Sequence, residues 1–361
     1  MNDISFTHIA HPAPVTATRR AELLEDPGFG RVFTDHMATI RYKKVAGWHD
    51  AKLEPRMPIP MDPASAVLHY AQEIFEGLKA YRTPVGGVTL FRPDANGKRF
   101  QRSAARLAMP LLPEALFIAA VEGLVKIDHA WIPSGDRSLY IRPFMFATDA
   151  ILGVKASSEY LFTVIASPVA GYFNTAAASL RVWVTGDYSR AAAGGTGAAK
   201  CGGNYAASII AQAEGTRQGC DQVVFLDAAE RCWIEELGGM NIFFAFNDGS
   251  LLTPPLNGNI LAGITRDSLL TLGKDRGLNV REENYSLAQW QRDAKSGRLL
   301  ETFACGTAAV VAPIGQVQTR EGSFTIGDGG EGPLSRQLRT ALVDIQRGNA
   351  PDPHGWVYKV M

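Results

Sequence analysis

The sequence lacks an excess of charge of either sign. Its 361 residues include 36 Lys and Arg and 36 Asp and Glu, so the formal net charge is zero. Without a global basic field, the chain has no general attraction for nucleic acid or for an anionic membrane surface. It also lacks an apolar run of the roughly 18 residues that a membrane helix requires, and its N-terminus shows no basic region followed by an apolar core. We therefore expect a cytoplasmic protein that binds neither nucleic acid nor membrane.

Metal-ligand patterns and cysteine pairs are also missing. The four cysteines form no C-x-x-C pair, and the seven histidines show no H-E-x-x-H spacing. Zinc sites use such spacings, and a few scattered cysteines do not predict a disulfide framework. We expect neither disulfides nor a bound metal. The cysteines are Cys201, Cys220, Cys232 and Cys305.

The length and composition are those of a globular protein with two domains. Apolar residues make up 46% of the chain and charged residues 20%. Residues 171–179, GYFNTAAAS, are small, polar and aperiodic, which is typical of a linker. We predict a mixed α/β fold divided near residue 175. Residues 1–172 would form a small N-terminal domain, residues 173–182 the linker, and residues 183–361 a larger C-terminal domain.

Hydrophobic periodicity predicts the main elements. β-branched and aromatic residues indicate strands, and apolar residues three and four positions apart indicate helices. In the first domain we expect strands at 31–43, 138–148 and 160–169, and helices at 103–110 and 113–132. The second domain opens with LRVWVTGDY at 180–188. There we expect a helix at 204–219 with Asn204 as its N-cap, a strand at 221–227 and a hairpin around Asp248-Gly249.

The stretch GGTGAAKCGGNYAAS, residues 194–208, surrounds one amine, Lys200, with small side chains. A phosphate loop of the Walker type needs Gly before the lysine and Ser or Thr after it, but Ala199 and Cys201 occupy those places. Two interpretations stay open, a solvated glycine loop and a backbone that passes close to a flat cofactor. In the second case, the helix start that follows would disfavour the ammonium form and so activate Lys200 as a nucleophile.

Three further segments could contact a ligand, although each also has an ordinary structural explanation. WIEELGGMNIFF, residues 233–244, places two acids before a Gly-Gly turn, and an exposed pair of glutamates is the alternative. LAGITRDSLL, residues 261–270, begins a helix that Thr265 can cap and whose N–H groups can hold a phosphate. ETFACGTAAVVAP, residues 301–313, contains a Gly-Thr-Ala turn whose backbone donors could serve an anion or only the turn.

Taken in order, these segments resemble the branched-chain-amino-acid aminotransferases, pyridoxal-phosphate enzymes of fold type IV. The resemblance runs over residues 28–358. It rests on F-E-G-L-K-A at 75–80, K-C-G-G-N-Y at 200–205 and E-L-G-G-M-N at 236–241, a highly specific set. It implies the two-domain architecture of the D-amino-acid-aminotransferase type, with the cofactor bound mainly by the C-terminal domain.

The resemblance assigns the residues that would bind pyridoxal 5'-phosphate. Lys200 would form a Schiff base with the cofactor aldehyde and then move a proton between the substrate Cα and the cofactor C4′, because the pKa of a lysine can be tuned towards neutral. Glu236 would pair with the pyridine nitrogen, and Tyr205 with the ring 3′-oxygen. The phosphate would rest on Arg99, the backbone amides of Ile264 and Thr265, the Thr265 hydroxyl and the Thr307 region.

Two of these assignments depend on the resemblance alone. Arg99 precedes Arg102 and Arg106 by three and seven residues, a spacing that otherwise indicates a solvated basic stripe. Tyr205 would otherwise be interpreted as a half-buried aromatic residue of a helix.

The implied substrate pocket takes an aliphatic side chain in one half-reaction and the γ-carboxylate of glutamate in the other. The resemblance assigns Tyr140 and Arg142 to the distal carboxylate, and the backbone N–H groups of Thr307 and Ala308 to the substrate carboxylate. A pocket that the partner subunit completes implies an obligate homodimer. The apolar lining would come from Phe29, Phe75 and Tyr172, and from Tyr70, Leu152 and Val154 reaching in from the partner subunit.

Two positions depart from the family pattern. Ala309 and Ala312 stand where animal members carry a C-x-x-C redox pair, so we expect no thiol switch there. Gly239 stands where many members carry Thr. The change removes one side-chain contact near the ring or the carboxylate, and we expect it to affect substrate preference rather than the chemistry.

The expected function is a reversible transfer of an amino group between leucine, isoleucine or valine and 2-oxoglutarate, by a ping-pong mechanism. The nearest alternatives are a D-amino-acid aminotransferase or an aminodeoxychorismate lyase of the same fold. Those chains are typically shorter and lack the F-E-G-L-K-A-Y and L-Y-I-R-P segments. A non-catalytic binding protein that keeps the fold would lack Lys200 or Glu236, and both are present.

Overall fold

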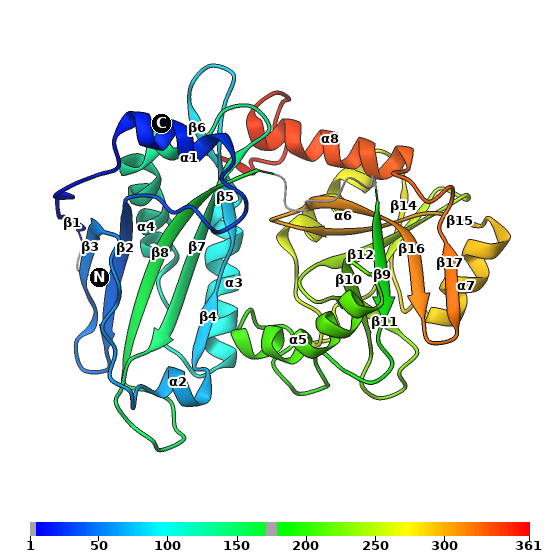
Figure 1. The fold of residues 1–361 in the computed structure, drawn as a ribbon, viewed down its shortest axis with the longest axis horizontal. Coiled ribbons are helices and arrows are strands. Elements are labelled where there is room, and N and C mark those ends of the chain that lie inside the picture. The colour runs from blue at the N-terminus through cyan, green and yellow to red at the C-terminus, as the bar shows by residue number, and fades with distance from the viewer. Residues whose placement is uncertain (1–4, 171–178) are drawn as a thin grey trace. The chain divides into compact units, whose positions relative to one another are not determined.

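The computed structural model describes residues 5–170 and 179–361, and its chain divides into two compact units (Figure 1). Each unit is built around one nine-stranded sheet, which agrees with the mixed α/β class expected from the sequence. The first unit comprises Met1–Tyr172, Ala199–Gly202 and Ile345–Met361, and the second comprises Phe173–Ala198 and Gly203–Asp344.

The first sheet is antiparallel except at one edge, where β1 runs parallel to β3. Its strand order is β1-β3-β2-β8-β7-β5-β6-β18, and β4 pairs with β7. Strands β7 and β8 pair along nearly their whole length, with Ser138 opposite Val169 and Ala147 opposite Tyr160. The strands are β1 (Thr7–His8), β2 (His36–Lys43), β3 (Gly47–Pro55), β4 (Glu73–Phe75), β5 (Leu78–Arg82), β6 (Val88–Phe91), β7 (Ser138–Ala147), β8 (Glu159–Val169) and β18 (Val357–Lys359).

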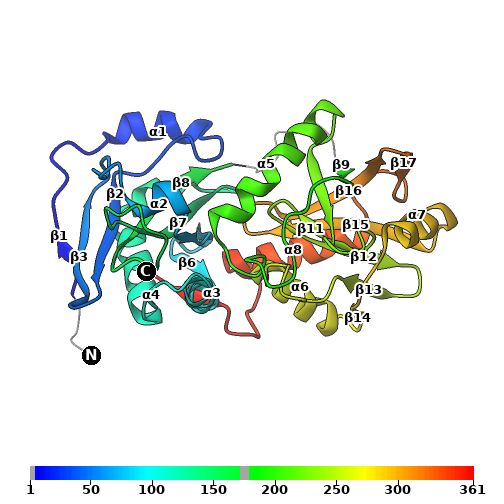
Figure 2. The same cartoon turned by 90° about the horizontal axis from the view of Figure 1, so that it is seen from below.

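Helices α3 and α4 lie side by side and pack against this sheet (Figure 2). In α4, apolar residues three and four positions apart form one buried stripe, which includes Phe117, Val121 and Leu124. The Phe117 ring packs with Phe100 of α3 and Phe162 of β8, with ring centroids 5.4 to 6.0 Å apart. The helices of this unit are α1 (Ala17–Glu25), α2 (Ala66–Tyr70), α3 (Pro93–Arg106), α4 (Glu114–Ile127) and the 3-10 helix η1 (His129–Trp131).

The second sheet is mixed, because β9 runs parallel to both of its neighbours, β10 and β16. Its order is β11-β10-β9-β16-β15-β12-β13-β14, and β17 pairs with β16. Strands β12 and β13 form the hairpin expected around Asp248-Gly249, with Gly249 in the left-handed region at φ 78°. The strands are β9 (Leu180–Val184), β10 (Gln222–Leu226), β11 (Ile234–Leu237), β12 (Asn241–Phe246), β13 (Ser250–Thr253), β14 (Asn279–Glu282), β15 (Leu299–Gly306), β16 (Val310–Thr319) and β17 (Gly322–Thr325).

Helices of the second unit cover this sheet, with α6 packing on β14 and β15, and α7 on β15 and β17. Trp290 of α7 is fully buried, and its ring lies 5.4 Å from Phe244 and 5.6 Å from Phe324. The second unit therefore has a hydrophobic core of its own. The helices are α5 (Gly202–Arg217), α6 (Ile264–Asp275), α7 (Leu287–Ser296) and α8 (Pro333–Arg347).

Several element boundaries differ from the sequence-based expectation. Helix α3 begins at Pro93, well before the expected segment 103–110, and it ends at Arg106. Proline is favoured in the first turn of a helix, where its missing N–H costs nothing. The segment expected as one helix at 113–132 is α4 followed by η1, and β2 begins at His36 rather than at residue 31.

The C-terminal segment belongs to the first unit, where β18 pairs with β6 and places Val357 opposite Phe91. The division expected from the sequence differs here, because it gives all of residues 183–361 to the second domain. Residues 173–178 of the expected linker lie outside the described residues, and its residues 180–182 belong to β9 (Leu180–Val184).

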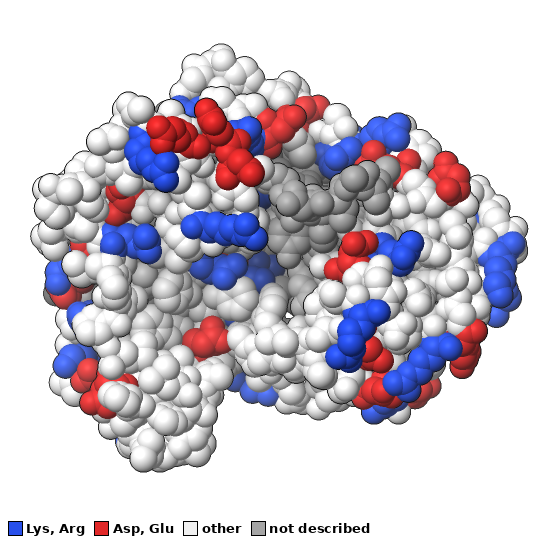
Figure 3. All heavy atoms as spheres, viewed as in Figure 1, with Lys and Arg blue, Asp and Glu red and all other residues white. Residues whose placement is uncertain are grey.

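All four cysteines are free thiols. Across residues 5–170 and 179–361, no helix combines the length and the apolar character that crossing a membrane requires. In the same ranges, no group of three or more His, Cys, Asp or Glu side chains could hold a metal ion. On the face drawn in Figure 3, Lys and Arg are interspersed with Asp and Glu.

Candidate active site

The backbone around Lys200 is fixed within the first unit. Lys200 is half-buried, and its neighbours Ala199 and Cys201 are each only 3% exposed. Gly194 and Gly195 are exposed, so a solvated glycine loop is present but does not extend to the lysine. The Lys200 N–H donates to the Ser103 hydroxyl of α3 at 2.9 Å. The Lys200 carbonyl accepts from the backbone N–H of Phe75 in β4, also at 2.9 Å. These two hydrogen bonds hold the lysine between a strand and a helix.

The Lys200 amine faces the F-E-G-L-K-A segment of the same unit. Its Nζ lies 4.7 Å from the centre of the Phe75 ring, a distance at which a cation is attracted to the aromatic face. It also interacts electrostatically with the neighbouring Glu76. The amine therefore lies beside an aromatic ring and a buried carboxylate.

Glu76 is a fully buried carboxylate to which sequence reasoning gave no role. Arg99 donates to both of its oxygen atoms, from Nε at 2.7 Å and from Nη2 at 2.8 Å, and Asn96 donates at 2.7 Å. Burial raises the pKa of Glu76, but the charges of Arg99 and Lys200 and the hydrogen bonds from Arg99 and Asn96 outweigh it, so the net pKa lies below the usual 4.5. Arg99 is 4% exposed, so it is not part of a solvated basic stripe.

Four of the expected substrate-binding residues lie together in the first unit. The Arg142 Nη2 donates to the Tyr140 hydroxyl at 3.0 Å, and the Arg142 guanidinium lies over the Phe75 ring at 4.7 Å. The Phe29 ring meets the Tyr140 ring edge-on at 5.2 Å. Gly77 is required here, because a Cβ at this position would overlap the Tyr140 hydroxyl. The result is an aromatic surface with one guanidinium and one hydroxyl.

Tyr70, Leu152 and Val154 form a second group in this unit. The Tyr70 hydroxyl donates to the Leu152 carbonyl, while Leu152 is 65% and Val154 is 83% exposed. Tyr172, which we expected in the pocket lining, lies outside the described residues.

In the second unit, Glu236 is held inside strand β11. It is 3% exposed and its neighbour Glu235 is 2% exposed, so the exposed pair of glutamates is ruled out. The Leu261 N–H donates to Glu236 Oε1 at 2.9 Å, and Asn241 Nδ2 donates to Oε2 at 3.3 Å. Arg190 Nη2 lies 2.6 Å from Oε1. An ionised carboxylate is the species that these donors match.

Helix α5 carries Tyr205 beside the Gly-Gly turn that follows β11, and a Cβ on Gly239 would lie 3.5 Å from Tyr205 Cε1. The expectation that Asn204 caps this helix is wrong, because α5 begins at Gly202. Asn204 lies within the first turn. Its Nδ2 donates to the Thr196 carbonyl at 2.8 Å, and its Oδ1 accepts from the Thr196 hydroxyl at 2.7 Å.

Helix α6 begins as expected within residues 261–270, but Thr265 is not its cap. The N-cap is Gly263, and no side chain provides a cap hydrogen bond, while Thr265 is the second helical residue and is buried. A Cβ on Gly263 would overlap Asn241 Oδ1, so the helix start lies against the residue that donates to Glu236. Thr307 and Ala308 lie in the turn between β15 and β16.

Sequence reasoning missed Glu76, Ser103, Arg190 and Asn241. Glu76 and Asn241 lie inside two of the quoted motifs, so the motifs themselves contained a signal. Ser103 and Arg190 showed none, because their partners Lys200 and Glu236 are distant in the chain.

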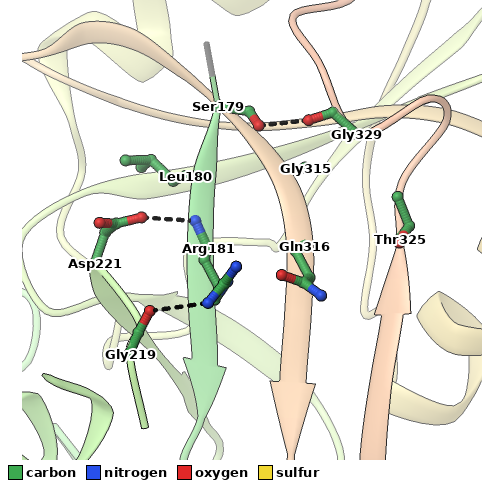
Figure 4. A pocket seen from close by; sticks show the side chains of 9 residues that line it. All are labelled: Ser179, Leu180, Arg181, Gly219, Asp221, Gly315, Gln316, Thr325 and Gly329. Atoms are coloured by element: carbon green, nitrogen blue, oxygen red, sulfur yellow. Dashed lines mark hydrogen bonds between the residues drawn. The ribbon is translucent and has the colours of Figure 1, made fainter. Parts of the chain in front are cut away.

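The pocket in Figure 4 belongs to the second unit and shares no residue with the expected site. Its volume is about 490 Å³. Hydrogen bonds join some of the residues that line it. The backbone N–H of Arg181 donates to the Asp221 carboxylate at 2.8 Å, and the Ser179 hydroxyl donates to the Gly329 carbonyl. Its lining residues are Ser179, Leu180, Arg181, Gly219, Asp221, Gly315, Gln316, Thr325 and Gly329.

Comparison with known proteins places the chain in a family. Residues 73–317 match the family described as amino-transferase class IV. A probable branched-chain-amino-acid aminotransferase of Streptomyces coelicolor is 53% identical over 347 residues, which cover 96% of each chain. The branched-chain-amino-acid aminotransferase of Mycolicibacterium smegmatis is 50% identical over 362 residues, which cover 99% of this chain and 98% of the relative.

Solved structures show the same fold. The branched-chain amino acid aminotransferase of Escherichia coli has a TM-score of 0.74 at 27% identity, covering 90% of this chain and 100% of the other. The T.th. branched-chain amino acid aminotransferase with pyridoxamine 5'-phosphate has a TM-score of 0.71 at 29% identity, covering 90% and 99%. The fold is thus the expected fold type IV architecture of pyridoxal-phosphate enzymes. The chain belongs to the class IV aminotransferases, in the branched-chain-amino-acid aminotransferase family.

Proposed function

We propose that this protein transfers an amino group reversibly between L-leucine, L-isoleucine or L-valine and 2-oxoglutarate, with pyridoxal 5'-phosphate as its cofactor. The observation that carries the proposal is the surface of the first unit on which the Lys200 amine and the Arg142 guanidinium share the Phe75 ring. This reaction needs an amine for the chemistry, an aromatic surface for an aliphatic side chain and a cation for a carboxylate.

The residues present fit the cofactor. Gly263 provides no capping side chain to the first turn of α6, and a helix start of this kind favours a phosphate. Glu236 offers a buried carboxylate, which matches a protonated pyridine nitrogen. Ile264, Thr265, Thr307 and Arg99 would hold the phosphate, and Tyr205 the ring 3′-oxygen. When bound, the cofactor supplies an electron sink for the carbanion of the amino acid.

Lys200 would hold the cofactor covalently and would move the proton of the reaction. Its Nζ would take the proton at the substrate Cα, a positioned proton transfer worth about 10² to 10⁴ in rate. Hydrogen bonds join the Lys200 backbone to Ser103 and Phe75. They would hold the main chain in place while the Lys200 side chain moves. Glu236 would hold a proton at the ring nitrogen, and Tyr205 would orient the ring.

Dual substrate recognition follows from one aromatic surface with a polar side. Phe29 and Phe75, with Tyr172, accept the aliphatic side chain of a branched-chain amino acid. The Tyr140 hydroxyl and the Arg142 guanidinium, 3.0 Å apart, receive the γ-carboxylate of 2-oxoglutarate. A guanidinium beside a hydroxyl is a strong pair of donors for a carboxylate. The backbone N–H groups of Thr307 and Ala308 hold the α-carboxylate.

The working enzyme is a homodimer in the cytoplasm that binds neither nucleic acid nor membrane. Leu152 and Val154, with Tyr70, enter the substrate pocket of the partner subunit. The exposure of these two apolar side chains, 65% and 83%, supports that role. The zero net charge of the chain and the mixed charges on the face in Figure 3 support the absence of a nucleic-acid partner.

An assay of glutamate formation from L-leucine and 2-oxoglutarate tests the proposal. The protein loaded with pyridoxal phosphate is expected to form glutamate. Lys200→Ala is expected to lose at least about 10² to 10⁴ in rate, because the proton-transfer group is gone. Lys98→Ala is the matched control, since Lys98 is an exposed lysine paired with Asp94, and it should keep full activity.

Full turnover by Lys200→Ala would overturn the assignment of Lys200. Activity with D-amino acids and none with L-leucine would instead favour the D-amino-acid aminotransferases of the same fold. A protein that binds no pyridoxal phosphate would not be an aminotransferase.

A further inference from the structure

Arg190 makes a buried ion pair with Glu236 in the second unit. Its side chain is 4% exposed, and its Nη2 lies 2.6 Å from Glu236 Oε1. Leu261 donates to the same oxygen at 2.9 Å, and Asn241 donates to the other at 3.3 Å. Arg190 is the donor in this set that carries a full charge.

Backbone atoms hold the guanidinium in place. Arg190 Nη2 also donates to the Gly197 carbonyl at 3.1 Å and to the Asn259 carbonyl. Gly197 is itself fixed, because a Cβ at that position would overlap the Asn259 carbonyl oxygen. Two main-chain carbonyls therefore hold the same guanidinium nitrogen that approaches Glu236.

Stability alone does not explain this pair. The desolvation of two buried charges largely offsets their attraction, so a buried ion pair adds little net stability. Arg190 Nε is also buried without a hydrogen-bond partner among the described residues, and an unsatisfied buried donor costs about 1–3 kcal/mol. A leucine or methionine would fill the space without either cost. Retaining an arginine here points to a function.

The charge of Arg190 acts on the proton that Glu236 shares with its ligand. A guanidinium cannot be deprotonated in a protein, and a positive charge at hydrogen-bond distance favours the ionised form of a carboxylate. A carboxylate that stays ionised leaves a shared proton on the other partner. For a pyridine ring, that partner is the ring nitrogen.

We propose that Arg190 is a positioning residue that fixes the Glu236 carboxylate and keeps the shared proton on the cofactor's ring nitrogen. The inference rests on the proposed function, in which Glu236 pairs with that nitrogen. Arg190 acts through Glu236 and touches neither substrate nor cofactor. Loss of Arg190 would weaken the withdrawal of electrons by the cofactor ring. It should therefore lower kcat more than it changes KM.

The test places ¹⁵N in the ring of pyridoxal phosphate and records the nitrogen chemical shift in the loaded enzyme. Wild type is expected to show a protonated ring nitrogen. Arg190→Met is expected to move the shift towards that of neutral pyridine, and to lower kcat by at least about tenfold, the change that one pKa unit of proton affinity represents. KM for L-leucine should change little.

Arg190→Lys keeps a positive charge and is expected to restore most of the wild-type shift and rate. Arg298→Met is the control, because Arg298 also pairs with a buried carboxylate, Asp293, at 3.6 Å in the same unit. It should leave the ¹⁵N shift and kcat unchanged. Rescue by lysine would show that charge matters, since a lysine cannot reproduce the packing of a guanidinium.

A wild-type ¹⁵N shift and kcat in Arg190→Met would overturn the proposal. The proposal would also be wrong if Arg190→Met and Arg190→Lys lose activity equally while both keep a protonated ring, because Arg190 would then only hold the loop in place. Failure of the proposed function can be distinguished from these outcomes, because the wild-type protein would then give no ¹⁵N signal from bound cofactor.

Discussion

Glu236 is the residue whose surroundings most restrict what it can do. It is 3% exposed, and Leu261, Asn241 and Arg190 direct three donors at its two oxygen atoms. Glu236→Gln keeps the shape of the side chain but removes its charge, so it can no longer stabilise a protonated ring nitrogen. We expect kcat to fall by about 10² to 10⁴, the range of a lost proton-transfer contribution. Single-turnover kinetics with L-leucine measure it.

Glu235→Gln is the matched control for this variant. Glu235 lies in the same strand and is equally buried, and it accepts from Asn259 Nδ2 at 2.8 Å. A glutamine there keeps an acceptor for that bond, so the single-turnover rate should stay near wild type. If Glu236→Gln reacts as fast as Glu235→Gln, another group keeps the ring nitrogen protonated.

Residues inside motifs could be predicted from the sequence, whereas their supporting contacts could not. The resemblance carried by F-E-G-L-K-A and K-C-G-G-N-Y directed attention to Phe75 and Lys200, and the structure places the two side chains together. The ion pairs of Arg99 with Glu76 and of Arg190 with Glu236 depend on how distant segments meet in the fold. No local pattern in the sequence predicts which arginine is buried.

At the scale of elements, the start of helix α5 determines where Lys200 lies. The backbone N–H of Gly202 donates to the Glu73 carboxylate of β4, and a Cβ on Gly202 would overlap that carboxylate. Gly202→Ala should therefore displace the Glu73 carboxylate from its hydrogen bond to the start of α5. We expect a loss of about 1–3 kcal/mol in the free energy of unfolding, as for overpacking elsewhere, together with a lower kcat. Denaturant unfolding and steady-state kinetics measure the two effects.

Gly203→Ala provides a control one residue further along the same helix. A Cβ on Gly203 meets nothing within 4 Å, and alanine is favoured over glycine in a helix by up to about 1 kcal/mol. This variant should be as stable as wild type or more so. Equal stability of the two alanine variants would refute the steric role of Gly202.

The elements that could be predicted are those with a clear period. Strands β7 and β8 and the β12–β13 hairpin formed where they were expected, because aromatic and other large apolar residues dominate there. The cap of α5 was wrong for a physical reason, since the acceptor that meets its first N–H is Glu73, far away in the chain. Local sequence reasoning looks for a cap beside the helix and selected Asn204.

At the scale of the whole molecule, a buried lysine makes stability depend on pH. Burial, with Arg347 nearby, lowers the pKa of Lys79 from 10.5 to about 8. Between these values the unfolded chain binds more protons than the folded one, so stability rises with pH. The shift corresponds to roughly 3 kcal/mol at 1.36 kcal/mol per pKa unit, a penalty that is fully present below about pH 8 and absent above about pH 10.5.

Lys79→Met removes that penalty. At neutral pH the variant should be more stable than wild type, and its advantage should shrink as the pH rises through the window of Lys79. Thermal unfolding of the cofactor-free proteins across this range measures the difference. Lys98→Met, at an exposed lysine, should show no such trend. An advantage of Lys79→Met that stays constant with pH would contradict the titration of Lys79.

The proposed dimer predicts complementation between inactive subunits. Val154→Asp places a charge in the partner's pocket and should abolish activity with L-leucine. A mixed dimer of Val154→Asp and Lys200→Ala contains one site with every native residue, so mixing the two inactive proteins should restore activity. Mixing Lys200→Ala with Glu236→Gln should restore none, because each subunit then damages its own site. Equal recovery in both mixtures, or none in the first, would contradict the shared site.

The path of the chain at its C-terminus could not be predicted from the sequence. Strand β18 returns to the first unit and pairs with β6, although the chain leaves that unit near residue 172. Strand pairing between segments so far apart depends on register and packing. A short segment such as Val357–Lys359 carries too little pattern to show it.

One absorption experiment tests the central claim most directly. The purified protein, loaded with pyridoxal phosphate, is measured alone, after addition of L-leucine, and again after addition of 2-oxoglutarate. We expect the yellow absorption band to disappear with L-leucine and to return with 2-oxoglutarate, since both half-reactions use one site. A band that ignores L-leucine, or that responds only to a D-amino acid, would contradict the proposed transamination.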